Sequence, residues 1–248
     1  MTGIHLPFDH LIFAILLIFP IVEWRWTWPR YMARLADGVP RARLDFYRSL
    51  LLEEWIATAA LLACWAGSGR PWQALLLIRA STLPSGSLRF AIGMAVAVAL
   101  CALLVLQNKA IRARPDVMPR VRKKLAYAEP ILPHTSAERL RFHAVSITAG
   151  ICEEALFRGF LLWYFAVWVG PWPAAILSSI VFGAGHAYLG VRQIPNTALI
   201  GLIMATLALL SGSLWPAMLL HAAIDWNSGD LGFSVLNAPE TAADPLRR

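Results

Sequence analysis

Apolar runs long enough to cross a bilayer recur along this chain, and they limit its possible folds more than any other feature. The first run extends from about residue 6 to residue 28, whereas a helix needs only about 20 apolar residues to span the hydrocarbon core. Hydrophobic residues make up 58% of the 248 residues and charged residues only 15%, a composition too apolar for a soluble domain of this length. Because backbone in lipid must satisfy its hydrogen bonds within each segment, we expect an all-α, polytopic transmembrane helix bundle.

The apolar runs and the basic loops between them predict about seven spans, with the N-terminus outside and the C-terminus inside. Residues 109–141 hold nine Lys or Arg, and a second basic stretch follows the first apolar run, whereas residues 1–5 hold none. Basic loops stay in the cytoplasm, so we expect both stretches on that side, in contact with anionic lipid headgroups and not with nucleic acid. The expected spans lie near residues 6–28, 50–66, 90–106, 145–169, 172–187, 194–210 and 214–226.

The residue usage indicates a bacterial membrane protein. Arg outnumbers Lys 19 to 3 and Ala and Leu are abundant, which is typical of a GC-rich bacterial genome, so we expect a multi-pass protein of the inner membrane. The first apolar run has neither a basic segment before it nor a small-residue cleavage site, so it is expected to be retained. Cys64, Cys101 and Cys152 lie in apolar runs without Cys-x-x-Cys spacing, which indicates neither a disulfide framework nor a thiolate metal site.

Three ionisable residues interrupt the apolar run 145–169, in the sequence Ile-Cys-Glu-Glu-Ala-Leu-Phe-Arg at residues 151–158. Charged groups are costly in hydrocarbon, so such a cluster indicates a functional site. Glu154 and Arg158 are four residues apart and share one helix face, which predicts a structural ion pair. Glu153 points about 100° away and is left without a local partner, so we expect it to carry the chemistry. The alternative is a structural ion pair beside a second glutamate that reaches the interface.

Polar residues also interrupt two further runs. His186 ends the sequence Phe182-Gly-Ala-Gly-His, and His221 and Asp225 are four residues apart, on one helix face. A single histidine in an apolar helix is more often a packing residue, but two histidines with Glu153 and Asp225 favour a common site. Such a set can activate water and stabilise an oxyanion, or it can bind a catalytic zinc ion.

The three motifs together resemble those of a known family. Glu-Glu-x-x-x-Arg at 153–158, Phe-x-x-x-His at 182–186 and His-x-x-x-Asp at 221–225 are similar to the motifs of the CAAX-protease and bacteriocin-processing (CPBP) family of intramembrane proteases. The resemblance covers about residues 140–228. It implies hydrolysis of a peptide bond at the membrane, with water positioned and activated by Glu153 and His186. It also implies that His221, with the residue at 225, supports the oxyanion.

One position departs from the family pattern. Relatives that process prenylated proteins commonly have Asn where this chain has Asp225. An ionised aspartate cannot donate a hydrogen bond, so Asp225 is expected to be protonated, to orient His221, or to help hold a metal.

Cofactor use stays open at this level. A zinc site would use Glu153, His186 and His221, whereas a metal-free site would use Glu153 as the base beside His186. The chain has no His-Glu-x-x-His sequence that would place two ligands on one helix face, which favours the metal-free alternative.

The resemblance implies a division into N-terminal transmembrane segments with basic cytoplasmic loops (1–141), a catalytic core (142–228) and a polar tail (229–248). The substrate is expected to be membrane-associated: a lipidated C-terminal peptide, a bacteriocin leader, a sorting-signal tail or an anchored regulator. A proton- or ion-coupled transporter is the alternative function, but the sequence lacks the internal repeat typical of transporters. The remaining acidic pair, Glu53 and Glu54, has no arginine four residues on and is interpreted as an interfacial anchor.

Overall fold

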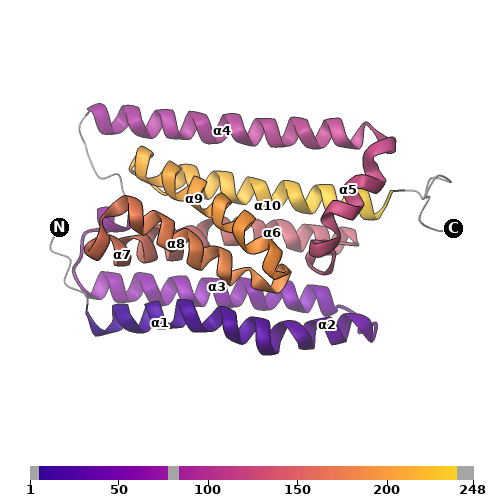
Figure 1. Cartoon of the computed structure of the whole chain (residues 1–248), viewed down its shortest axis with the longest axis horizontal. Coiled ribbons are helices and arrows are strands. Elements are labelled where there is room, and N and C mark those ends of the chain that lie inside the picture. Colours follow the sequence, from indigo (N-terminus) through magenta and orange to yellow (C-terminus); the bar gives the residue numbers. More distant parts are fainter. Residues whose placement is uncertain (1–5, 78–83, 239–248) are drawn as a thin grey trace.

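The computed structural model of the chain describes residues 6–77 and 84–238. Within these ranges the chain is helical with no strand, which confirms the all-α prediction. Successive long helices cross the molecule in alternating directions (Figure 1). Four stretches are long and apolar enough to span a membrane: Pro7–Ala36, Ala42–Gly67, Gly86–Arg112 and Val191–Ser211. These helices support a multi-pass membrane protein, whereas the count of seven spans and the outward N-terminus stay predictions.

The N-terminal half consists of three long helical passes and a connecting segment. Its elements are α1 (Pro7–Val22), the π-helix η1 (Glu23–Thr27), α2 (Trp28–Ala36), α3 (Ala42–Gly67), the 3-10 helix η2 (Trp72–Leu75), α4 (Pro84–Arg112), the 3-10 helix η3 (Pro115–Val117), α5 (Met118–Leu125) and the 3-10 helix η4 (Ala126–Ile131). The turn between α2 and α3 lies at the same end of the molecule as α5 (Figure 1), as expected if both basic stretches face one side of a membrane.

The C-terminal half contains the three motifs. Its elements are α6 (Ser136–Glu153), the π-helix η5 (Glu154–Leu161), α7 (Leu162–Val169), α8 (Pro171–Gly185), the 3-10 helices η6 (Ala187–Leu189) and η7 (Val191–Gln193), α9 (Ile194–Ser211) and α10 (Trp215–Leu236). Helix α6 lies between α3 and α10 and packs against both (Figure 1). The α6–η5 junction is therefore enclosed by the bundle.

Two glycines allow the motif helices to approach their neighbours closely. A Cβ at Gly150 of α6 would lie 2.9 Å from the carbonyl oxygen of Met218 on α10. A Cβ at Gly183 of α8 would lie 2.7 Å from the carbonyl oxygen of Ile194 on α9. Any larger residue would separate these helices, since real Cβ atoms do not approach so closely, and small residues have this role at transmembrane interfaces.

The end of α10 differs from the expected boundary. The polar tail was predicted from residue 229, but α10 continues to Leu236. Gly229 and Gly232 are buried because Phe142 and Leu132 pack directly over them, leaving no room for a Cβ at either position. The polar composition therefore belongs to a packed helical turn, and the predicted tail beyond residue 238 lies outside the described residues.

Candidate active site

The helix that carries Glu153 has a well-defined start and an irregular end. Thr135 caps α6 by accepting a hydrogen bond from the backbone N–H of Glu138 (3.2 Å), and the Glu138 carboxylate accepts from the Thr135 N–H (3.0 Å), which forms a capping box. After Glu153 the helix widens into the π-helix η5. π-Helical turns are rare in proteins, and those that occur often lie at functional sites.

Glu154 is fully buried at the first position of η5 and accepts two hydrogen bonds through its Oε1 atom. One comes from Nη1 of Arg158 (2.8 Å), so the predicted i, i+4 pair is present in the structure. The other comes from Nδ1 of His221 (2.8 Å), 67 residues later on α10. This carboxylate therefore connects an arginine on its own helix to a histidine on another.

The arginine of this pair is also fully enclosed. The Arg158 guanidinium lies over the ring of Phe182, 4.0 Å from its centroid, in a cation–π contact. A Cβ at Gly201 of α9 would lie 2.9 Å from Nη2 of Arg158, so the absence of a side chain there leaves room for the guanidinium. Phe182 and Gly201 thus hold Arg158 from two further helices.

The hydrogen bond to Glu154 fixes the orientation of the His221 ring. Because a carboxylate only accepts, Nδ1 carries the proton, and Nε2 is directed to the other acids. Nε2 lies 3.7 Å from Oε2 of Glu153 and 3.6 Å from Oδ2 of Asp225. Both distances are too long for a hydrogen bond but within the range of an ion pair.

Glu153 differs from Glu154 in having spare hydrogen-bonding capacity. Its side chain is 19% exposed, yet its Oε2 atom is buried and has no hydrogen-bond partner among the described residues. A buried carboxylate oxygen without a hydrogen bond costs free energy, and such atoms need an explanation in a native structure. This oxygen is free to accept a proton or a hydrogen bond from a bound molecule.

His186 lies where α8 ends, and its position is set by its own helix. Nδ1 makes a hydrogen bond with the backbone oxygen of Phe182 (2.9 Å), and since a carbonyl only accepts, Nδ1 is the protonated nitrogen. In the neutral imidazole Nε2 is then the nitrogen with the lone pair. The Phe182 ring lies against both imidazoles, with centroid distances of 4.6 Å to His186 and 5.9 Å to His221. Within residues 6–77 and 84–238, no ion pair joins His186 to Glu153.

Asp225 does not orient His221 through a hydrogen bond, because its Oδ2 lies 3.6 Å from Nε2, beyond hydrogen-bond distance. Glu154 provides that orientation instead. The Asp225 side chain is 35% exposed, whereas the His221 side chain is only 8% exposed. Asp225 therefore lies at the more open edge of the cluster.

The three residues of the zinc alternative, Glu153, His186 and His221, are not assembled into a metal site among the described residues. No group of three His, Cys, Asp or Glu side chains within the described part of the chain is arranged to hold a metal ion. Of the expected set, His221 and Glu153 are 3.7 Å apart, and His186 is held against the Phe182 backbone. As arranged, these residues do not fit a bound zinc ion.

The structure corrects the interpretation that the sequence suggested for one acidic residue near the site. Glu54 was expected to be an interfacial anchor, but its Oε2 atom is buried without a hydrogen-bond partner among the described residues. Glu54 lies within electrostatic range of Glu153 and Asp225, and Glu23 of η1 lies within electrostatic range of Glu153. The sequence did contain a sign of this position, since Glu54 interrupts an apolar helix as Glu153 does.

Comparison with known proteins agrees with these motifs. Residues 135–227 match the model of the Rce1-like family, described as type II CAAX prenyl endopeptidases. No curated protein and no solved structure matches the chain. The match supports an intramembrane CAAX-protease kind of function, for which a membrane-associated prenylated peptide is the implied substrate. The resemblance indicated by the three motifs is therefore confirmed, and the segment that contains Glu153, His186, His221 and Asp225 is a match to the Rce1-like family of type II CAAX prenyl endopeptidases.

Proposed function

We propose that the chain is an intramembrane endopeptidase that hydrolyses a peptide bond of a membrane-anchored, prenylated peptide. The observation that carries this proposal is Oε2 of Glu153, which has no hydrogen-bond partner among the described residues and lies 3.7 Å from Nε2 of His221. The other nitrogen of that imidazole is bound to the fully buried Glu154–Arg158 pair. A base of this kind needs an available acceptor atom held in a fixed position. The family match supports the choice of substrate class.

In this proposal Glu153 is the general base. The water oxygen attacks the carbonyl carbon of the scissile bond while Oε2 of Glu153 takes the water proton. The same proton then passes to the leaving amine nitrogen as the C–N bond breaks. His186 accepts a hydrogen bond from the water through Nε2, since its Nδ1 proton is used by the Phe182 backbone oxygen.

His221 supports the oxyanion that forms on the carbonyl oxygen. The carboxylates of Glu153, Glu154 and Asp225 lie within 3.7 Å of its ring nitrogens, and this arrangement favours the doubly protonated imidazolium. Its Nε2–H is then a charged donor, which is stronger than a neutral one. Asp225 acts in this account through its charge, because an ionised aspartate has no proton to donate.

The transporter alternative is not favoured. In a transporter the polar residues would have to mark a path across the membrane. Here the carboxylates of Glu153, Glu154 and Asp225 gather around the single imidazole ring of His221. A single compact cluster is the arrangement expected for a chemical step.

Purified full-length protein, reconstituted in lipid, tests the proposal with a synthetic prenylated CAAX-type peptide. We expect cleavage of this peptide and little cleavage of the same peptide without its prenyl group. Glu153→Gln should reduce kcat by about 10²–10⁴-fold, the usual contribution of a general base, without loss of fold. Glu53→Gln, which removes a glutamate from α3, is the control and should leave kcat near the wild-type value.

Three outcomes would contradict the proposal. Equal activity of Glu153→Gln and Glu53→Gln would remove Glu153 from the chemistry. Equal cleavage of the two peptides would remove the prenyl group from recognition. Absence of cleavage together with proton or ion flux in the same vesicles would favour the transporter.

A further inference from the structure

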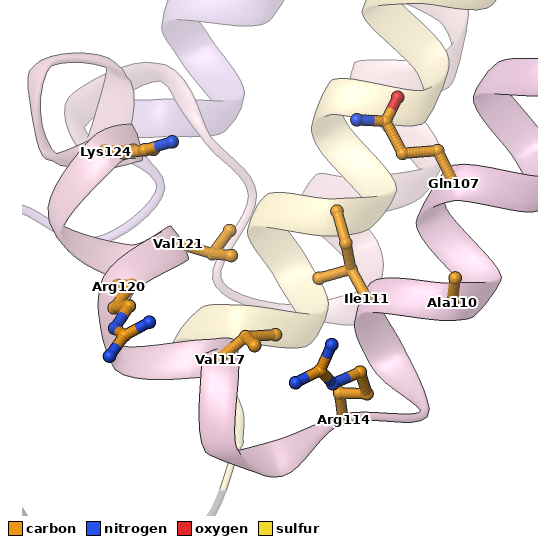
Figure 2. Close-up of a pocket in the computed structure, with 8 residues that line it drawn as sticks. All are labelled: Gln107, Ala110, Ile111, Arg114, Val117, Arg120, Val121 and Lys124. Atoms are coloured by element: carbon orange, nitrogen blue, oxygen red, sulfur yellow. The ribbon is translucent and has the colours of Figure 1, made fainter.

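A cavity lies away from the candidate active site, where the end of α4 turns through η3 into α5 (Figure 2). Its volume is about 350 Å³. Three cationic side chains and three branched apolar side chains account for most of its lining: Arg114, Arg120, Lys124, Ile111, Val117 and Val121. The α4 side and the α5 side face one another across the space (Figure 2).

The cations of this cavity are only partly neutralised. Arg114 donates a hydrogen bond to Asp116 (3.0 Å), and both side chains are about two-thirds exposed. This hydrogen bond and the charges of Arg114 and Arg120 lower the pKa of Asp116, so that carboxylate is ionised. Arg120 and Lys124 have no ion pair within residues 6–77 and 84–238. Three cations and one carboxylate leave two positive charges unmatched.

The apolar part of the lining distinguishes this cavity from a simple basic surface. Ile111, Val117 and Val121 are half-buried, whereas Arg114, Arg120 and Lys124 are exposed. In Figure 2 the Ile111 side chain on the α4 side and the Val121 side chain on the α5 side lie across the space from one another. A small inorganic anion would use the cations but leave the branched side chains in water. A molecule with both an anionic group and an apolar part would contact both.

The cavity also lies at the depth of lipid headgroups. The stretch Gly86–Arg112 is long and apolar enough to span a membrane, and the cavity begins at its last turns with Gln107. The end of a spanning helix lies where hydrocarbon meets headgroups. A lipid phosphate and the first carbons of its chains would therefore be at the right height.

We propose that this cavity is a binding site for an anionic phospholipid. Arg114, Arg120 and Lys124 bind the headgroup phosphate, and the glycerol and upper acyl carbons lie over Ile111, Val117 and Val121. Arginine suits this ligand because its planar guanidinium binds two phosphate oxygens at once. The lipid would hold the loop between α4 and α6 against the membrane surface.

The test measures competition between fluorescent phosphatidylglycerol and phosphatidylcholine for the full-length protein in nanodiscs at physiological salt. Wild type should prefer phosphatidylglycerol. The combined variant Arg114→Gln, Arg120→Gln, Lys124→Gln should lose that preference, by about fivefold for each cation removed. The matched control, Lys109→Gln, Arg122→Gln, Lys123→Gln, removes three charges from the same region that do not line the cavity, and should keep most of the preference.

Val121→Trp tests whether binding needs the space of the cavity in addition to its charge. It fills the space without altering a cation, so it should also lose the preference for phosphatidylglycerol. Free glycerol phosphate should compete poorly, because it lacks the acyl carbons. Equal loss in the two triple variants, full retention in Val121→Trp, or equal competition by glycerol phosphate would each overturn the proposal. If the first triple variant does not fold, Val121→Trp decides the question.

Discussion

Asp9 and Glu154 are both fully buried carboxylates that pair with an arginine, but they differ in how completely their polar atoms are bonded. Asp9 accepts from Arg70 through both oxygens, at 2.9 and 2.7 Å, and also from the N–H of Leu6. The Arg70 guanidinium is covered by the rings of Trp65 and Trp163. This arrangement, the Asp9–Arg70 clamp, joins the start of α1 to the segment after α3.

The Glu154–Arg158 pair is bonded less completely. Oε2 of Glu154 and Nε and Nη2 of Arg158 are buried and have no hydrogen-bond partner in the described ranges of the chain. The neighbouring Oε2 of Glu153 is in the same condition. A buried pair with every atom bonded is what a structural contact requires, whereas unbonded polar atoms cost free energy and tend to be retained where function needs them. The Asp9–Arg70 clamp therefore has the features of a structural contact, whereas the Glu154–Arg158 pair has those of a candidate functional site.

The largest expected effect comes from breaking each pair. Glu154→Gln should destabilise the fold by about 3–5 kcal/mol, because the buried Arg158 charge loses its partner. Activity per folded molecule should also fall, since His221 loses its ionic acceptor. Asp9→Asn should lower stability but leave activity per folded molecule unchanged. Denaturant unfolding and kcat, measured on the same preparations, check both. A fall in the activity of Asp9→Asn equal to that of Glu154→Gln would end the distinction.

A smaller effect is expected at Gly201, where the space for Arg158 can be reduced without altering a charge. Gly201→Ala places a methyl group 2.9 Å from Nη2 of Arg158, and the resulting overpacking should cost about 1–3 kcal/mol and lower kcat. Gly67→Ala in α3 is the control, because its Cβ meets nothing within 4 Å. It should be neutral or stabilising by up to about 1 kcal/mol. Equal unfolding free energies in the two variants would show that Arg158 is not tightly held.

Asp225→Asn tests the departure from the family pattern. The Asp225 side chain is 35% exposed and lies 3.6 Å from His221, so its contribution should be about 1 kcal/mol or less, equivalent to less than a tenfold change in kcat/KM. The fold should be unchanged. A loss of more than about a hundredfold would mean that a protonated Asp225 donates to the oxyanion, since such a loss exceeds the value of an exposed ion pair.

The smallest effect is expected from metal removal. We predict that the purified enzyme contains substoichiometric zinc by elemental analysis and retains cleavage after exhaustive chelation. Stoichiometric zinc, whose removal stops cleavage and whose return restores it, would instead make Glu153, His186 and His221 ligands.

Contacts within one helix were predictable from sequence, and contacts between helices were not. The spacing of Glu154 and Arg158 predicts their pair directly, because residues four apart are neighbours on a helix. The bond between Glu154 and His221 depends on how α6 and α10 are rotated about their axes, which spacing within either segment does not specify. The π-helix that begins at Glu154 has no propensity signal of its own.

Glu54 and residues 229–236 were misinterpreted for the same reason. Glu54 was judged by the absence of an arginine four residues on, a test for a local partner, whereas it lies within electrostatic range of Glu153 on another helix. Residues 229–236 were judged by polar composition, although Gly229 and Gly232 allow α10 to pack there. In both cases a tertiary contact outweighed the local pattern.

Mass spectrometry of the products formed in ¹⁸O-labelled water shows whether Glu153 activates water for peptide hydrolysis. Wild-type protein should convert the prenylated peptide into two fragments, with one ¹⁸O atom in the new carboxylate. Glu153→Gln, folded and tested at the same concentration, should give neither fragment above background. Labelled fragments from Glu153→Gln at the wild-type rate would contradict the account.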